Sequence, residues 1–243
     1  DICLLKEVGI KPIVVHGGGP QINEILKKRK IKSNFVNGLR ITDNETIKVV
    51  KDILINKINK EIVKNINNIG GKAISLSGNK NKLIIVKKIK IYEKSNNKKL
   101  LDIGFVGEPY KINNSLINKY LKKNYIPVIA PLGSIGEQIY NINADTVAGA
   151  IAGSIKSSKL LLLTDIAGIK NEHNKLIQSI HLKEARKLIK KDFIKDGMRP
   201  KIETCIKALK LGVKEATIMD GRIPHALILE LFTIVGIGTQ LKK

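Results

Sequence analysis

Cysteine, aromatic residues and long apolar runs are all scarce in this chain. Cys3 and Cys205 are the only cysteines in 243 residues, far apart and in no metal-ligand spacing, so neither a disulfide framework nor a zinc site is indicated. No apolar run approaches the roughly 20 residues that a membrane-spanning helix needs, and residues 1–6 do not form the charged and apolar regions of a signal peptide. We therefore expect a soluble protein in a reducing compartment, without a membrane partner.

Arginine is also scarce, although the chain is strongly basic. The formal net charge is +23, which on its own points to a nucleic-acid or anionic-membrane surface. Most of the 44 basic residues are lysines spread along the chain, and aromatic residues make up 4%. Nucleic-acid sites favour arginine for its two-pronged hydrogen bonding and stack bases on aromatic rings. We interpret the lysines as mainly solvated surface and expect no nucleic-acid partner, while charge alone leaves nucleic-acid binding and steering of anionic substrates open.

Apolar periodicity and turn signals predict strands and helices in alternation. A glycine-containing segment at 31–41 predicts a hairpin, and residues 93–99 a polar turn. The predicted strands are 11–16, 73–76, 83–92, 103–106, 126–130, 138–142, 159–163, 216–219 and a closing strand after Gly238. The predicted helices follow Gly19, run from Thr42-Asp43 to Gly70, pass through 116–121, and cover 144–155, 182–189, 200–211 and 224–232. We therefore expect an α/β fold, a three-layer αβα sandwich with a mainly parallel central sheet, and a boundary between lobes near 131–137.

The first candidate site is the triple glycine after the first predicted strand. Glycines at a strand end let backbone N–H groups approach an anion where a helix N-terminus already favours negative charge. His16-Gly17-Gly18-Gly19 is neither a Walker A motif nor a dinucleotide fingerprint. The residues alone fit a plain tight turn and a phosphate cradle about equally, and His16 alone fits packing better than catalysis.

A second candidate combines Asn141, Asn143 and Asp145 where a predicted strand meets a predicted helix. A helix cap requires one such residue, so three of them favour a polar binding cluster over an ordinary cap. Lys201 follows Pro200 in a predicted first helical turn, where a cation is unfavourable unless an anion compensates it. A surface lysine is the alternative in so basic a chain.

Asp165 follows a predicted strand, at the position where open α/β sheets bind ligands. A turn cap explains this residue equally well. The sequence has no nucleophile elbow, His-Glu-x-x-His helix or EF-hand loop, so we expect no metal site built by the protein. Phosphoryl transfer suits the glycines, lysines and carboxylates that remain, because it requires mainly positioning and charge neutralisation.

Taken in order, the motifs resemble those of the acetylglutamate kinases, a branch of the amino-acid kinase family, from Lys11 to Leu241. The matching segments are IVVHGGGPQIN at 13–23, NGLRIT at 37–42, LSG at 76–78, GFVGEP at 104–109, YIPVIAPLG at 125–133, YNINADTVAGAIA at 140–152, LLLTDIAGI at 161–169 and GRIPHALILELFT at 221–233. Carbamate, aspartate, glutamate 5- and uridylate kinases share the glycine turn but not the NGLR and NINAD pair. The resemblance implies transfer of the γ-phosphate of ATP, supplied with Mg²⁺ and without a tightly bound cofactor, to the side-chain carboxylate of N-acetyl-L-glutamate in arginine biosynthesis.

The resemblance also implies roles for individual residues in one kinase domain. An N-terminal lobe, residues 1–133, would bind acetylglutamate and dimerise, and a C-terminal lobe, residues 134–243, would bind ATP. Gly18 and Gly19 would offer backbone donors to the phosphoryl group and the attacking carboxylate. Arg40 would hold the α-carboxylate of the substrate, a contact that suits the arginine fork. Asn141 would hydrogen bond the bound acetylglutamate.

On the nucleotide side, the resemblance gives Asp145 the task of orienting the catalytic lysines. Lys201 would stabilise charge on the transferring phosphoryl group, and Asp165 would belong to the nucleotide site. The C-terminal block resembles arginine-inhibited members, so Glu230 and the backbone at Gly236 are expected to contact L-arginine as feedback inhibitor; a packed helix with an exposed carboxylate is the alternative. The resemblance also implies a homodimer or hexamer and a PII-type regulator. It implies a cytoplasmic location, or the plastid stroma if the source is a photosynthetic eukaryote.

One family feature is missing. An opening strand with a lysine followed by Gly-Gly precedes, in the family, the segment that here begins at Asp1. We interpret the sequence as N-terminally incomplete and lacking one of two catalytic lysines. Two alternatives therefore stay open: another small-acid kinase of the same family, and a catalytically silent module that senses arginine or a nucleotide.

Overall fold

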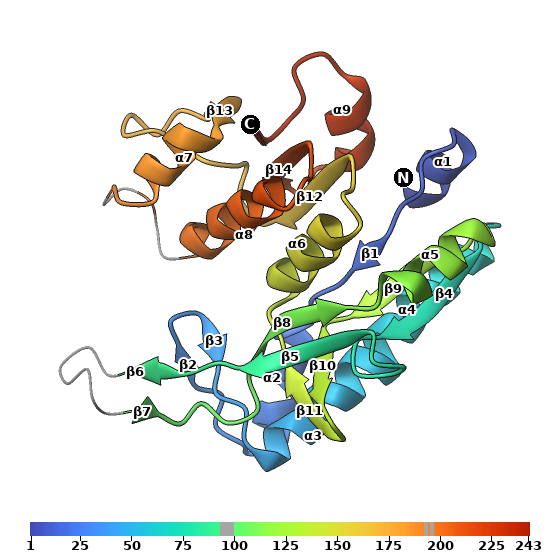
Figure 1. The fold of residues 1–243 in the computed structure, drawn as a ribbon, viewed down its shortest axis with the longest axis vertical. Helices are drawn as coiled ribbons and strands as arrows, with labels where there is room; N and C mark the ends of the chain where they lie inside the picture. The colour runs from blue at the N-terminus through green and yellow to red at the C-terminus, as the bar shows by residue number, and fades with distance from the viewer. Residues whose placement is uncertain (93–99, 192–193, 195–196) are drawn as a thin grey trace. The chain divides into compact units, whose positions relative to one another are not determined.

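A computed structural model describes residues 1–92, 100–191, 194 and 197–243. The chain divides into two compact units, which we call the N-terminal unit, residues 11–147, and the C-terminal unit, residues 1–10 with 148–243. Figure 1 shows the elements of both. The polar turn predicted at 93–99 lies outside the described residues.

A parallel three-stranded sheet forms the centre of the N-terminal unit. Its order is β1-β9-β4, with β1 at Val14–Val15, β9 at Ile126–Ala130 and β4 at Ala73–Ser77. All five residues of β9 are buried, as is typical of a parallel strand covered on both faces. The predicted strands at 73–76 and 126–130 are confirmed, and the one at 11–16 is confirmed but shorter.

A mixed four-stranded sheet and two hairpin pairs complete the strands of this unit. The sheet order is β11-β10-β5-β8, with β5 at Ile84–Lys88, β8 at Gly107–Ile112, β10 at Leu132–Ile135 and β11 at Gln138–Asn141. The predicted hairpin is confirmed as β2, Phe35–Val36, paired with β3, Leu39–Arg40. Asn37 and Gly38 have φ of 50° and 77°, the left-handed backbone that such a two-residue turn requires. A short pair joins β6, Ile91–Tyr92, to β7, Leu100–Leu101.

The long helix predicted between Asp43 and Gly70 is confirmed in extent but not in type. It consists of α3 (Asn44–Asp52), a π-helix η1 (Ile53–Asn59) and α4 (Lys60–Asn68). Two further helices are α2 (Gly19–Lys28) and α5 (Asn114–Lys122). A buried cluster joins α2 to α3, η1 and two adjacent strands through Ile22, Leu26, Val49, Val50, Ile53, Leu54, Ala130 and Leu132. The π-helix is therefore part of the core that packs against α2.

The C-terminal unit has a second four-stranded sheet with order β12-β14-β15-β13. Its strands are β12 (Lys159–Thr164), β13 (Ser179–His181), β14 (Glu215–Asp220) and β15 (Thr239–Lys242). Its helices are α1 (Ile2–Glu7), α7 (Leu182–Leu188), α8 (Met198–Lys210), α9 (Ala226–Phe232) and the part of α6 (Ala144–Ser154) that follows Val147. Figure 1 shows α8 lying over β12 and β14. The core on this face includes Leu160, Leu162, Ile202, Leu209 and Ile218.

Glycines allow α6 to approach α8 closely. A Cβ atom on Gly149 would lie 2.5 Å from Thr204 Cγ2, and one on Gly153 would lie 2.7 Å from Leu211 Cδ1. Any larger residue at these positions would displace its neighbour. The small residues that the sequence places on α6 are thus packing residues.

Two sequence-based expectations about the fold are wrong. The strand predicted at 103–106 is not formed; the strand there is β8, which begins at Gly107. The reason is Gly104, whose φ of +72° and close approach to the Thr42 backbone interrupt an extended strand. The division of the chain falls between residues 147 and 148 instead of near 131–137, because β10 and β11 pair with each other and β10 pairs with β5. The α/β class with parallel strands is confirmed, and the pairing of β14 with β15 is antiparallel.

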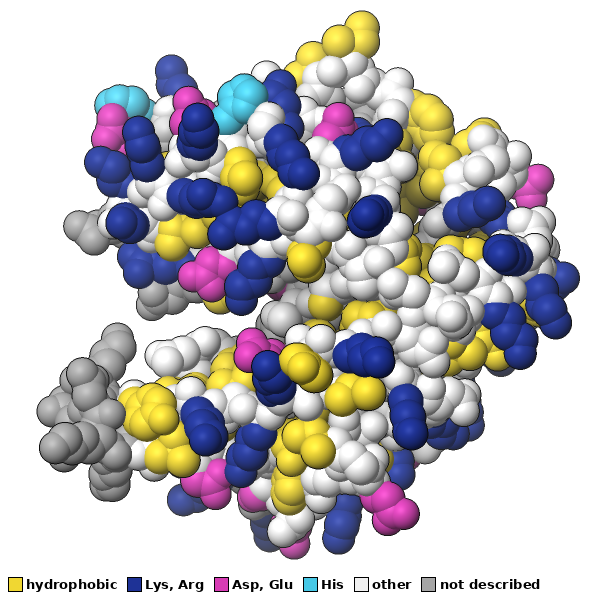
Figure 2. Space-filling view, viewed as in Figure 1, with side chains coloured by type: hydrophobic (Ala, Val, Ile, Leu, Met, Phe, Trp, Pro, Cys, Tyr) yellow, Lys and Arg dark blue, Asp and Glu magenta, His cyan; other side chains and the backbone are white. Residues whose placement is uncertain are grey.

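Basic side chains are spread over the visible surface. On the face in Figure 2, lysine and arginine side chains are scattered among other types and form no continuous basic stripe. Among the described residues, no helix has the length and apolar character needed to cross a membrane.

We predict that Asp43→Ala lowers the free energy of unfolding by about 1 kcal/mol at pH 7. The Asp43 carboxylate accepts a hydrogen bond of 2.8 Å from the Thr46 amide at the start of α3, and this bond lowers the pKa of Asp43. A lowered pKa means that the stabilisation is present above the unfolded pKa, roughly 3.9, and is lost as pH falls through the folded pKa.

Urea denaturation between pH 7 and pH 2 measures the effect, with Asp43→Asn as the control that keeps a cap without a titrating group. The difference between the parent and Asp43→Ala should shrink at acid pH. A difference that is independent of pH would contradict the assignment.

Candidate functional site

The triple glycine connects β1 to the N-terminus of α2. Gly18 is the N-cap with an extended backbone, φ 177°, and its carbonyl accepts a hydrogen bond of 2.9 Å from the Ile22 amide. A Cβ atom on Gly18 would lie 2.6 Å from Ile58 Cδ1 and 2.8 Å from Leu54 Cδ2, whereas Gly17 and Gly19 have open space. Gly18 is therefore required for the turn to lie against η1. The exposed amides at the start of α2 can receive an anion.

His16 is a buried residue that contacts this turn through its side chain. The residue is 7% exposed; Nδ1 lies 2.9 Å from the Gly17 carbonyl oxygen and Nε2 lies 3.0 Å from the Asn59 amide nitrogen. Burial lowers the pKa of His16, so the ring is neutral at physiological pH. The interpretation of His16 as a packed, turn-bonding residue is consistent with this geometry.

Arg40 lies beside the glycine turn and is a buried cation that has no carboxylate partner among the described residues. The side chain is 7% exposed, and burial lowers the pKa of its guanidinium, although arginine remains charged. Nη1 donates to Asn23 Oδ1 at 2.7 Å and to Ser33 Oγ, and Nη2 reaches the Gly19 carbonyl oxygen at 3.5 Å. Within the described part of the chain, no carboxylate forms an ion pair with Arg40. A buried, uncompensated cation next to a helix N-terminus is suited to an anionic ligand.

Asn141 is connected to the Arg40 segment through Thr42. Asn141 Nδ2 donates to Thr42 Oγ1 at 3.3 Å, and Thr42 Oγ1 donates to the Arg40 carbonyl oxygen at 2.8 Å. Asn143 instead caps α6 by accepting a bond of 3.0 Å from the Thr146 amide. Within the predicted polar cluster, Asn143 is thus an ordinary cap. Asp145 lies in the first turn of α6.

The N-terminal unit therefore brings together Gly18, Gly19, Arg40 and Asn141. Lys201, Asp165, Glu230 and Gly236 belong to the C-terminal unit. Lys201 lies in the N-terminal part of α8, which begins at Met198, two residues before the predicted start. No group of three or more His, Cys, Asp or Glu side chains among residues 1–92, 100–191, 194 and 197–243 is arranged to hold a metal ion.

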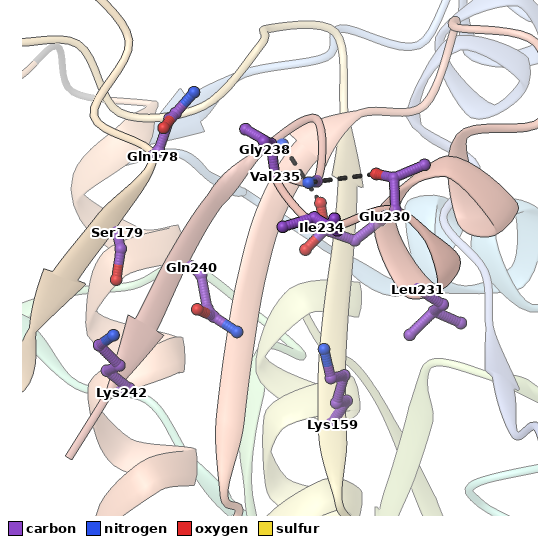
Figure 3. Close-up of a pocket in the computed structure, with 12 residues that line it drawn as sticks. Lys159, Gln178, Ser179, Glu230, Leu231, Ile234, Val235, Gly238, Gln240 and Lys242 are labelled. Carbon is purple, nitrogen blue, oxygen red and sulfur yellow. Dashed lines mark hydrogen bonds between the residues drawn. The ribbon is translucent and has the colours of Figure 1, made fainter.

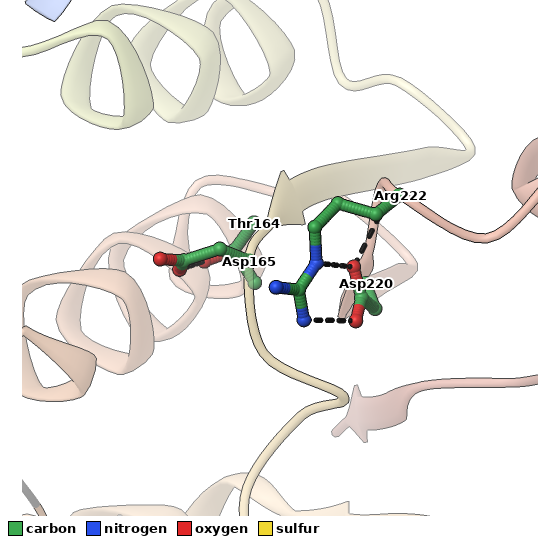
Figure 4. Close-up of polar contacts among 4 residues, drawn as sticks. All are labelled: Thr164, Asp165, Asp220 and Arg222. Atoms are coloured by element: carbon green, nitrogen blue, oxygen red, sulfur yellow. Dashed lines mark hydrogen bonds and ion pairs between the residues drawn. The ribbon is translucent and has the colours of Figure 1, made fainter. Parts of the chain in front are cut away.

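Asp165 follows β12 at the carboxyl end of the C-terminal sheet, next to an ion pair that the sequence did not reveal. Thr164 and Asp220 are partners in the parallel register of β12 and β14, and Thr164 Oγ1 donates to Asp165 Oδ1 at 3.1 Å. Arg222 donates two hydrogen bonds to Asp220, which Figure 4 shows. Nε donates to Oδ1 at 2.9 Å, and Nη2 donates to Oδ2 at 2.7 Å. Hydrogen bonds from Arg222 lower the pKa of Asp220 to about 2. The only sequence signal for this ion pair is that Asp220 directly follows the strand predicted at 216–219.

Glu230 is buried, so the alternative of an exposed carboxylate on α9 is wrong. Its Oε1 accepts from Thr217 Oγ1 at 3.0 Å, and its Oε2 accepts from the amides of Ile237 and Gly238 at 2.9 and 3.3 Å. Gly236 has φ +69°, and a Cβ atom there would lie 2.7 Å from Glu230 Oε2. This carboxylate therefore holds the turn that precedes β15. A cavity of about 340 Å³ lies beside it. Its lining includes Lys159, Gln178, Ser179, Gln240 and Lys242, which Figure 3 shows.

Comparisons with known proteins show the family of the whole chain. The model of the amino acid kinase family matches residues 1–220. The chain is 50% identical to an acetylglutamate kinase of Rhodospirillum centenum and 49% identical to one of Parvibaculum lavamentivorans, in each case over 100% of this chain and 81% of the relative. Among solved structures, an N-acetylglutamate synthase of Neisseria gonorrhoeae, complexed with coenzyme A and N-acetyl-glutamate, matches with a TM-score of 0.87 and 23% identity, over 100% of this chain and 54% of that one. This last likeness concerns the fold.

We predict that Gly18→Ala destabilises the chain and that Gly19→Ala does not. A methyl group at Gly18 would overlap the ends of Ile58 and Leu54, and overpacking of this kind costs about 1–3 kcal/mol. Gly19 has open space and is the first residue of α2, where alanine is a better helix former than glycine. Thermal and urea unfolding of the two variants measures the difference. Equal stability of the two would show that the turn does not rest on η1.

Proposed function

Because the chain belongs to the amino acid kinase family, we propose that it phosphorylates the side-chain carboxylate of N-acetyl-L-glutamate with ATP as co-substrate. Relatives named acetylglutamate kinase, about half identical over the full length of this chain, support this substrate. The single observation that carries the proposal is the buried Arg40 guanidinium beside the glycine turn, without a carboxylate partner among the described residues. The reaction produces an acyl phosphate and ADP.

The substrate is a dicarboxylate, and the N-terminal unit offers two kinds of anion subsite. The planar fork of Arg40 suits the α-carboxylate, because two parallel hydrogen bonds fix its position and orientation. The amides of the glycine turn suit the reacting carboxylate and the phosphoryl group that it attacks. Asn141 supplies a side-chain amide for the remaining polar atoms of acetylglutamate.

The family resemblance supports roles for three further residues. Lys201 would stabilise the charge that develops on the phosphoryl group in the transition state, and Asp145 would orient catalytic lysines. Asp165, at the carboxyl end of β12, would serve the nucleotide site. ATP would enter with Mg²⁺, which partly neutralises the phosphates of this substrate.

We also propose L-arginine as a feedback inhibitor, with Glu230 and the backbone at Gly236 as contacts. The cavity beside this turn supports a ligand there. Because Glu230 already accepts three hydrogen bonds from the protein, ligand binding would be coupled to the conformation of the 231–238 segment. A homo-oligomer and a cytoplasmic setting are proposed on the same resemblance.

A coupled assay of ADP formation on the full-length protein tests the reaction directly, with N-acetyl-L-glutamate, glutamate, aspartate, carbamate and UMP as alternative acceptors. N-acetyl-L-glutamate should support turnover well above the other four. Preference for another acid would replace the proposed substrate within the family, and no turnover with any acceptor would favour a non-catalytic sensing role.

We predict that Arg40→Lys raises the Michaelis constant for acetylglutamate by about 10- to 100-fold and leaves that for ATP nearly unchanged. A lysine keeps the charge but loses the two-pronged contact, and hydrogen bonds to charged groups contribute about 1.5–3 kcal/mol. Arg29→Lys, the same change at an exposed position of the same unit, is the control. Equal losses for both substrates would remove Arg40 from the acetylglutamate site.

We predict that Lys201→Ala lowers the turnover number by a factor on the order of 10²–10³, the usual effect of removing one preorganised charge donor. The fold should be preserved, because a lysine near a helix N-terminus contributes little to stability. Lys207→Ala, at an exposed position later in α8, is the matched control. Turnover within about threefold of the parent, less than 1 kcal/mol of barrier, would contradict a catalytic role for Lys201.

A further inference from the structure

The π-helix places a buried asparagine against His16, the residue that precedes the glycine turn. Asn59 is the last residue of η1 and is 0% exposed. Its Nδ2 lies 3.0 Å from His16 Nε2, 3.0 Å from the Val128 carbonyl oxygen and 3.5 Å from the Leu76 carbonyl oxygen. Short π-helical segments are rare and often mark functional sites. Here the segment brings Asn59 and the apolar contacts of Gly18 to one place.

The backbone fixes which way the Asn59 amide points. Two carbonyl oxygens face Nδ2, and a carbonyl oxygen can only accept a hydrogen bond. In the reverse orientation the Asn59 side-chain oxygen would face these two carbonyl oxygens, and acceptors cannot hydrogen bond to one another. The amide has two N–H groups, and its two shorter contacts, of 3.0 Å each, are with the Val128 carbonyl oxygen and His16 Nε2. His16 Nε2 therefore accepts a hydrogen bond from Asn59 and carries no proton itself.

This orientation determines the tautomer of His16. A neutral imidazole with an unprotonated Nε2 carries its proton on Nδ1. Nδ1–H then donates to the Gly17 carbonyl oxygen at 2.9 Å. In a trans peptide the C=O and the following N–H point in opposite directions, so holding the Gly17 carbonyl toward His16 turns the Gly18 amide away from it. Among the described residues the Gly18 amide has no acceptor.

We propose that Asn59 is a positioning residue that fixes the His16 tautomer and thereby aims the Gly18 amide at the anion that the turn receives. The inference rests on the proposed function, which gives the Gly18 amide its ligand. Neither Asn59 nor His16 touches the substrate in this account. Both act through the direction of a single peptide group.

The tautomer can be measured without any turnover, by ¹⁵N NMR of the histidine-labelled chain. The His16 signals, identified by their loss in His16→Asn, should show a protonated Nδ1 and an unprotonated Nε2 at neutral pH. The Gly18 amide resonance should shift in Asn59→Leu and in His16→Leu. It should not shift in Asn56→Leu, an exposed position of the same π-helix. A protonated Nε2, or an unmoved Gly18 amide, would overturn the inference and leave the proposed function standing.

Kinetics separates positioning from a purely structural role. Asn59→Leu and His16→Leu should each lower kcat by about 10- to 100-fold with little change in KM, because a misplaced donor weakens the transition state most. The double variant should lose no more than either single variant, since both act through one peptide. His16→Asn, which keeps a donor near the Gly17 carbonyl, should recover part of the loss. Additive losses, or an active parent whose variants keep full kcat, would contradict positioning; an inactive parent would contradict the proposed function instead.

Discussion

The close contact between Gly18 and the π-helix is the constraint on which the N-terminal site depends. Without a Cβ atom at Gly18, the turn can lie against Ile58 and Leu54, and α2 begins directly after it. Leu54 also belongs to the buried cluster that joins α2 to α3 and η1. The proposed anion cradle would consequently be held by apolar packing, and in our proposal His16 and Asn59 set the direction of one peptide group in it.

The two arginines described in detail show how the same side chain is used differently. Arg222 is exposed and forms a two-pronged ion pair with Asp220, so its charge is already compensated. Arg40 is buried and bonded only to neutral groups among the described residues. An uncompensated buried charge is unfavourable in the empty protein, which is why Arg40 indicates an anionic ligand. The overall charge of +23 carries no such information, because most of it lies on scattered lysines.

Much of the fold could be predicted from local signals. Asn37-Gly38 specified its hairpin because both residues adopt positive φ, and the fully buried strand β9 was clear as an apolar run. The π-helix was not predictable, since apolar residues recur along 44–68 as they would in an α-helix. The strand expected at 103–106 failed because a single glycine contact with Thr42, distant in sequence, redirects the chain.

The candidate site was predictable as a set of residues but not as an arrangement. The motifs located the glycine turn, Arg40 and Asn141, and the structure brings these together in one unit. Burial without a counter-ion, which makes Arg40 informative, depends on side chains from Asn23 and Ser33 and has no signature in the sequence. Asn59 could not be found at all, because asparagine is common in this chain and its role depends on three acceptors far apart in sequence.

We propose that the glycine turn and Arg40 bind the two carboxylates of one acetylglutamate molecule. The most direct measurement is an amide and arginine side-chain NMR titration with N-acetyl-L-glutamate in the absence of nucleotide. The account predicts that the largest shifts occur at the amides of Gly18 and Gly19 and at the Arg40 guanidinium, with the Arg222 guanidinium unchanged. Shifts confined to the C-terminal unit, or saturable binding that leaves Arg40 unchanged, would contradict it.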